Sequence, residues 1–88
     1  MMVIKKDGRR EEFNINKTKV SIENASEEFR GELNSSDLEI ISKDIEKSIS
    51  QLGNKNTSSY EIIGATISIL NKNGFKNVAL EYVKNNLS

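Results

Sequence analysis

The chain has 88 residues and a mass of 9.9 kDa, which allows one small domain, expected over residues 1–88, with a modest core. It contains no cysteine and no histidine, which excludes disulfides, thiolate nucleophiles, serine–histidine triads and metal sites that need nitrogen or sulfur ligands. With 35% hydrophobic and 30% charged residues, it is too charged to span a membrane and too apolar to be a disordered tail. Charges precede any long apolar run at the N-terminus, unlike in a signal peptide, so we expect a cytoplasmic protein.

Charge is unevenly distributed along the chain. The net charge is zero, but residues 1–19 carry six basic and three acidic side chains, which leaves the remaining residues net acidic. A compact positive end on a neutral protein suits one small anion better than a nucleic-acid groove. The alternative is a solvated, charge-rich surface hairpin.

The first elements predicted are a β-hairpin and a helix. Residues 2–4 and 13–15 flank the turn dipeptide Asp7-Gly8, which is typical of tight hairpins. The helix begins near Asn16 and ends near Gly31, and its apolar face contains Ile22, Ala25 and Phe29.

Three further helices follow. Ser36 and Glu39 form a capping box before an apolar stripe that ends at Gly53. The stripe consists of Leu38, Ile41, Ile45, Ile49 and Leu52. A second capping box, Ser58 with Glu61, opens a helix that ends at Asn73-Gly74, and a last helix runs from Phe75 and frays toward Ser88. The pattern predicts an α+β fold, a four-helix bundle capped by a small N-terminal β-hairpin.

The usual glycine-rich phosphate-binding loops are missing from the sequence. Neither G-x-x-x-x-G-K-[ST] nor G-x-G-x-x-G occurs. The carboxylate pairs Glu11-Glu12 and Glu27-Glu28 lie among polar residues, as solvated charges do, so we do not expect an enzyme.

One cluster around the hairpin and the first helix favours ligand binding, and it consists of Lys5, Lys6, Glu11, Asn14 and Lys17. Three ammonium groups and a helix N-terminus suit a polyphosphate. A carboxylate and an amide supply the acceptor and donor that read a purine edge. The same residues can equally form cross-strand ion pairs, each contributing less than about 1 kcal/mol.

Residues 3–14, followed by Lys17, closely resemble the opening signature of the ATP-cone family, V-x-K-[RK]-[DN]-G-x-x-E-x-F-[ND] and a lysine three positions later. Residues 21–25 are similar to the first helix of that family, and Ser59-x-x-Ile62 with Leu70 is similar to its third. The resemblance spans nearly the whole chain and is strongest in residues 3–25.

The resemblance implies a four-helix bundle covered by a three-stranded sheet, whose third strand should lie near residues 54–56. It implies an allosteric module that binds ATP or dATP, with or without Mg²⁺. We expect no hydrolysis, because the sequence shows no general base, Mg²⁺-binding loop or water-positioning group. Family members regulate ribonucleotide reductases by changing oligomerisation, or act in the repressor of reductase genes behind a zinc ribbon, which this chain lacks. The partners it implies are therefore a second copy, a ribonucleotide reductase or another regulated protein.

The resemblance also assigns residues. Lys5, Lys6 and Lys17 would hold the triphosphate, Glu11 and Asn14 would contact the adenine, and Val3 would line the base pocket. Ser59 falls near the phosphates or sugar, although Ser58 or Thr57 can take that place. The alternative for Ser58 and Ser59 is that they serve only as helix caps. Ile63 stands where some members place a histidine against the sugar, and Lys84 is the nearest match to a late basic residue.

Two alternatives stay open at this point. The chain can be a nucleotide-independent dimerisation or interaction module. It can also be a nucleic-acid-associated regulator that uses the basic hairpin, but two tyrosines and three phenylalanines without an RNA- or DNA-binding motif give base readout little support.

Overall fold

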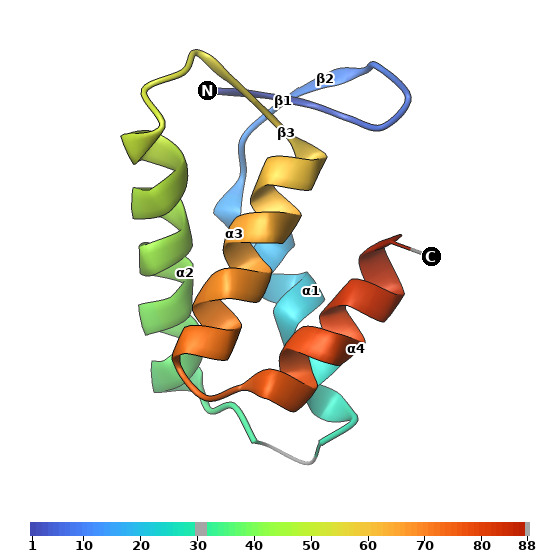
Figure 1. Ribbon diagram of the computed structural model, residues 1–88, viewed down its shortest axis with the longest axis vertical. Helices are drawn as coiled ribbons and strands as arrows, with labels where there is room; N and C mark the ends of the chain where they lie inside the picture. The colour runs from blue at the N-terminus through green and yellow to red at the C-terminus, as the bar shows by residue number, and fades with distance from the viewer. Residues whose placement is uncertain (30–31, 88) are drawn as a thin grey trace.

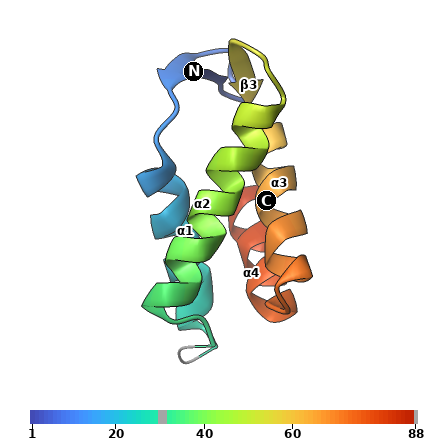
Figure 2. The same cartoon turned by 90° about the vertical axis from the view of Figure 1, so that its left-hand side faces the viewer.

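The computed structural model describes residues 1–29 and 32–87. Within these ranges the elements are β1 (Met2–Ile4), β2 (Arg10–Glu12), α1 (Ile15–Glu27), α2 (Ser35–Gln51), β3 (Asn56–Ser58), α3 (Ser59–Lys72) and α4 (Lys76–Leu87). The sheet lies across one end of the helices (Figures 1 and 2). The predicted α+β class is confirmed, with four helices and a small, mixed three-stranded sheet in the described part of the chain.

The sheet has β1 at its centre. β2 pairs with it in the antiparallel sense and β3 in the parallel sense, so that Val3 lies between Glu11 and Thr57. The third strand therefore exists, two residues later than predicted. A parallel pairing between the first residues and a segment more than fifty positions away closes the sheet over the helices.

The second strand differs from the prediction. It is Arg10–Glu12 rather than residues 13–15, because the turn is tight. The Lys5 N–H donates to the Arg9 carbonyl (2.7 Å) and the Gly8 N–H to the Lys5 carbonyl (2.9 Å), while Gly8 takes the φ of +88° expected of a turn glycine. Pairing therefore resumes at Arg10, and the chain is already entering α1 at Asn14.

Two predicted helix starts are wrong by two residues. The N-cap of α1 is Asn14, not Asn16, and Asn14 Oδ1 accepts from the Asn16 N–H at 3.0 Å. The N-cap of α2 is Asn34, which forms a capping box with Asp37 in place of the predicted Ser36–Glu39 pair. Leu33 and Leu38 flank this cap and are both buried in the core, as in a hydrophobic staple.

The other boundaries agree better with the sequence. Ser58 caps α3 and accepts from the Glu61 N–H at 3.1 Å. α2 and α3 end just before Gly53 and Gly74, which have φ of +69° and +86°. The predicted end of the first helix at Gly31, and the fraying at Ser88, lie outside the described residues.

The core is built from the apolar faces of all four helices. Its largest fully buried hydrophobic side chains are Ile22, Ile41, Ile45, Ile49, Leu70 and Val78. Leu52, predicted to belong to the apolar stripe of α2, is instead 48% exposed at the C-cap of that helix. Among the described helices, none combines the length and the hydropathy needed to cross a bilayer.

Candidate functional site

A cleft of about 380 Å³ opens between the β1–β2 hairpin, the first turns of α1 and α3, and the last turns of α4. This is within the usual size range of small-molecule sites, about 300–1,000 Å³. All the residues predicted from the sequence to bind a ligand line it, and these are Val3, Lys5, Lys6, Glu11, Asn14, Lys17 and Ser59.

The apolar wall of the cleft comes from three different elements. Val3 on β1 is 6% exposed, and Ile62 and Ile63 on α3 lie beside it in the lining, with Tyr82 from α4. The Tyr82 phenol is neutral at physiological pH, and burial raises its pKa further above the ordinary value. Together these side chains offer an apolar surface to a ligand.

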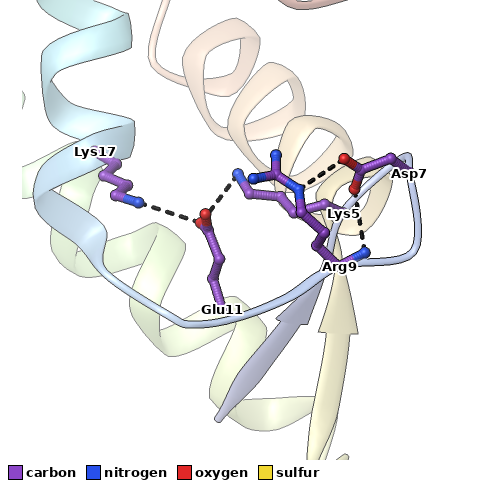
Figure 3. A network of polar contacts seen from close by, with 5 residues as sticks. All are labelled: Lys5, Asp7, Arg9, Glu11 and Lys17. Atoms are coloured by element: carbon purple, nitrogen blue, oxygen red, sulfur yellow. Dashed lines mark hydrogen bonds and ion pairs between the residues drawn. The ribbon is translucent and has the colours of Figure 1, made fainter.

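Three charged side chains meet at one carboxylate oxygen in the cleft (Figure 3). Glu11 Oε2 lies 3.2 Å from Lys17 Nζ and 3.4 Å from Lys5 Nζ. The hydrogen bond from Lys17, more than any other interaction, holds the pKa of Glu11 below its usual value, and Lys5 adds to the effect. Lys5 and Glu11 are thus brought together across the hairpin, and the first turn of α1 supplies Lys17.

Lys6 connects the hairpin to the far end of the chain. Its Nζ donates to the carbonyl oxygen of Asn86 at 2.6 Å and lies 5.8 Å from the centroid of the Tyr60 ring. Asn86 belongs to the last turn of α4, where carbonyl groups lack helical partners and the helix dipole favours a cation. The Lys6 ammonium is therefore placed in the cleft by two helices, α3 and α4.

Arg9 and Asp7 close the hairpin turn at the edge of the cleft (Figure 3). Arg9 Nε donates to Asp7 Oδ2 at 2.7 Å, and the Arg9 N–H donates to Asp7 Oδ1 at 3.1 Å. The backbone hydrogen bond is the main reason that the pKa of Asp7 lies below its usual value. This pair shapes the turn that carries Lys5 and Lys6.

Asn14 and Ser59 stand at the N-termini of two helices. The Oδ1 atom of Asn14 caps α1, which leaves both amide N–H donors and the second lone pair of the oxygen for a ligand. Ser58 caps α3, while Ser59, its first helical residue, lines the cleft. Both helices thus point their positive dipole ends toward the cleft, an arrangement that favours an anion.

Several lining residues escaped the sequence reasoning. Thr18 and Ser21 on α1 follow Asn14 at helical spacing, so the helix period could have found them. Ile62 follows Ser59 on α3 at the same kind of spacing, whereas Tyr82 and Asn86 could be found only by knowing how α4 packs. Ile63, which stands where some ATP-cones place a histidine, lines the cleft. Lys84 lies outside the lining formed by the described residues.

The charges in the lining are nearly balanced. Among the described residues that form it are four cations, from Lys5, Lys6, Arg9 and Lys17, and three carboxylates, from Asp7, Glu11 and Glu12. The described ranges contain no group of three side chains placed to hold a metal ion. Lysines and helix N-termini beside an apolar wall define a small module suited to an anion that carries an apolar ring.

Comparison with known families agrees with this class. The chain matches the model of the ATP cone domain over residues 1–84. The match covers nearly the whole chain, so the protein belongs to the ATP-cone family, whose members are nucleotide-binding regulatory domains associated with the control of ribonucleotide reductase. The comparison with curated proteins gave no match.

Proposed function

We propose that the protein is an allosteric sensor that binds ATP or dATP reversibly, without hydrolysis, and passes the binding event to a second copy of itself or to a partner such as a ribonucleotide reductase. The observation that carries the proposal is that the residues assigned to the nucleotide, from Val3 on β1 to Ser59 on α3, line one cleft. A cytoplasmic location, where adenine nucleotides are plentiful, fits this role.

The phosphates are assigned to Lys5, Lys6 and Lys17. Lys5 and Lys6 follow β1 in the hairpin connection and Lys17 lies on α1, and each ammonium is a flexible point charge that follows a phosphate oxygen. The N–H groups in the first turns of α1 and α3 add favourable dipoles. Ser59 stands at the start of α3, close to where a ribose or an α-phosphate would pass.

The adenine is assigned to the wall formed by Val3 and the polar pair Glu11 and Asn14. The Glu11 carboxylate accepts from the exocyclic amine of adenine, and the Asn14 amide donates to a ring nitrogen. Asn14 can do so while it caps α1, because capping uses only its oxygen. Val3 supplies the apolar contact for the ring.

The carboxylates of the cleft are poor candidates for catalysis. Asp7 is bound to Arg9, Glu11 to two lysines and Glu12 to the N-terminal ammonium at 3.2 Å. Lowered pKa values at Asp7 and Glu11 make both groups weak bases near neutral pH. This supports binding without turnover, with any Mg²⁺ arriving on the nucleotide phosphates.

Thermal unfolding with ATP, dATP, ADP and GTP tests the proposal on the wild type and on the double variant Lys5→Ala/Lys17→Ala. A ligand that binds only the folded state at 100 times its Kd adds about 2.7 kcal/mol, which shifts the Tm of a small domain by about 10 °C or more. We expect an adenine-selective shift that the double variant loses.

The matched control is Lys47→Ala/Lys76→Ala, which removes the same charge from exposed positions outside the cleft lining. It should retain the full shift. If no nucleotide shifts the Tm of the wild type, the proposal is wrong and the protein acts as a nucleotide-independent interaction module. Phosphate release from ATP by the pure protein would contradict the non-hydrolytic part.

A further inference from the structure

The Glu11 carboxylate occupies the part of the cleft where the phosphates of a nucleotide are expected to lie. A single oxygen of this carboxylate lies within 3.4 Å of both Lys5 Nζ and Lys17 Nζ (Figure 3). These are two of the three lysines assigned above to the phosphates. Without a nucleotide, the protein therefore neutralises part of its own phosphate site.

The position of Glu11 gives it a second possible partner. Glu11 lies directly opposite Val3 in the register of β1 and β2, and residues that face each other in this way project from the same side of a hairpin. Val3 is the residue assigned to the wall behind the base. A change of side-chain rotamer can thus carry the carboxylate from the lysines toward the base while the strand stays in place.

We propose that Glu11 couples recognition of the base to recognition of the phosphates: it occupies Lys5 and Lys17 in the free protein and leaves them only for a ligand whose base carries an exocyclic amine at the ring position where adenine has one. The inference rests on the proposed function, and adds to it a reason for selectivity. Glu11 acts here as a specificity-determining residue and as an internal competitor for the phosphate site.

The coupling distinguishes three kinds of ligand. ATP supplies phosphates for the lysines and an exocyclic amine for the displaced carboxylate. GTP presents a carbonyl oxygen at the corresponding ring position, which repels the carboxylate. Inorganic tripolyphosphate supplies phosphates alone, so its binding leaves Glu11 without a partner beside new negative charge. Since the lysines also hold the pKa of Glu11 low, the carboxylate is charged and competes at any pH near neutrality.

Calorimetric titration of the wild type and Glu11→Gln with tripolyphosphate, ATP and GTP tests the inference at fixed salt. The side chain of Glu11 is 32% exposed, and the amide keeps its shape, so the variant should fold, which a thermal melt checks. We expect Glu11→Gln to bind tripolyphosphate and GTP about five- to tenfold more tightly, the effect of releasing two exposed ion pairs. The preference for ATP over tripolyphosphate should also fall, because a neutral amide forms a weaker hydrogen bond with the adenine amine than a carboxylate does.

The matched control is Glu12→Gln, which removes the same charge from the next residue of the same strand. Glu12 lines the cleft but pairs with the N-terminal ammonium, so its loss should leave the preference for ATP unchanged. Equal gains in both variants would show a simple effect of net charge and overturn the inference, as would unchanged tripolyphosphate binding in Glu11→Gln.

The two proposals fail in different ways. If the wild type prefers ATP but Glu11→Gln binds tripolyphosphate no better, only the coupling is wrong. If the wild type does not bind ATP, the proposed function is wrong, and the coupling falls with it.

Discussion

Asn14 combines a role in folding with a proposed role in binding. Its Oδ1 atom caps α1, while its amide N–H groups belong to the side chain assigned to adenine. The sequence indicated a base contact here, but it placed the helix cap at Asn16. The shift arose because a strand was expected over residues 13–15, whereas β2 already ends at Glu12.

Replacing Asn14 separates the two roles. Asn14→Asp retains an oxygen for the Asn16 N–H and suits a helix N-terminus, so the free energy of unfolding should change little. Asn14→Ala should lower it by about 1 kcal/mol. Both variants lose the amide donor and should bind ATP more weakly, as urea unfolding and ATP titration would show. If Asn14→Asp binds ATP like the wild type, Asn14 is a cap alone.

The cluster of Lys5, Glu11 and Lys17 was only partly predictable from the sequence. The sequence left open whether Lys5, Glu11 and Lys17 form a ligand site or ion pairs. In the structure they form ion pairs within the cleft lining, so the two interpretations are compatible. Residue types and spacing identified the participants, but only three-dimensional distances could show that one carboxylate serves both lysines.

At the scale of single elements, helix periods were easier to predict than helix starts. Near α2 both Asn34-x-x-Asp37 and Ser36-x-x-Glu39 fit a capping pattern. The choice depends on Leu33 and Leu38, which are each 8% exposed and flank the Asn34 cap. Local hydrogen bonding alone cannot decide between a cap at Asn34 and one at Ser36, because the burial of these leucines is a property of the assembled core.

Two alanine variants in the first turn of α2 test this assignment. Asn34→Ala removes the capping oxygen that accepts from the Asp37 N–H at 2.8 Å and should cost about 1 kcal/mol of stability. Ser36→Ala, at an exposed position inside the helix, should change stability by less than about 0.5 kcal/mol. Chemical denaturation measures both, and a larger loss at Ser36 would place the cap where the sequence pattern first suggested.

At the scale of the whole molecule, the helical core was readable from the sequence and the closure of the cleft was not. Apolar spacing at i, i+3 and i+4 identified Ile41, Ile45 and Ile49, which are all buried. Nothing in that spacing brings Lys6 to the carbonyl of Asn86, 80 positions away. The same holds for the parallel pairing of β1 with β3. Such contacts depend on how complete elements pack.

Two isoleucines on α2 allow the stability contribution of a buried side chain to be compared with that of an exposed one. Ile45 is fully buried and Ile40 is 56% exposed. Ile45→Ala should cost about 2–5 kcal/mol, a large share of the total stability of a small domain. Ile40→Ala should cost less than about 0.5 kcal/mol, as expected of a surface substitution. Equal losses at the two positions would contradict the burial pattern of α2.

The destabilised Ile45→Ala variant also reports on the cleft as a whole. Both ends of the chain line the cleft, so it exists only in the folded molecule, and ligand binding must stabilise the entire fold. Ile45 lies outside its lining, so the substitution should leave the Kd for ATP unchanged. At 100 times the Kd, ATP should then add about 2.7 kcal/mol to both the wild type and Ile45→Ala, measured by urea unfolding with and without nucleotide. If ATP stabilises Ile45→Ala much less than the wild type, while it stabilises Ile40→Ala fully, the prediction is wrong. The loss of core packing would then have weakened ATP binding to the folded state, which means that the cleft opens when the core loosens.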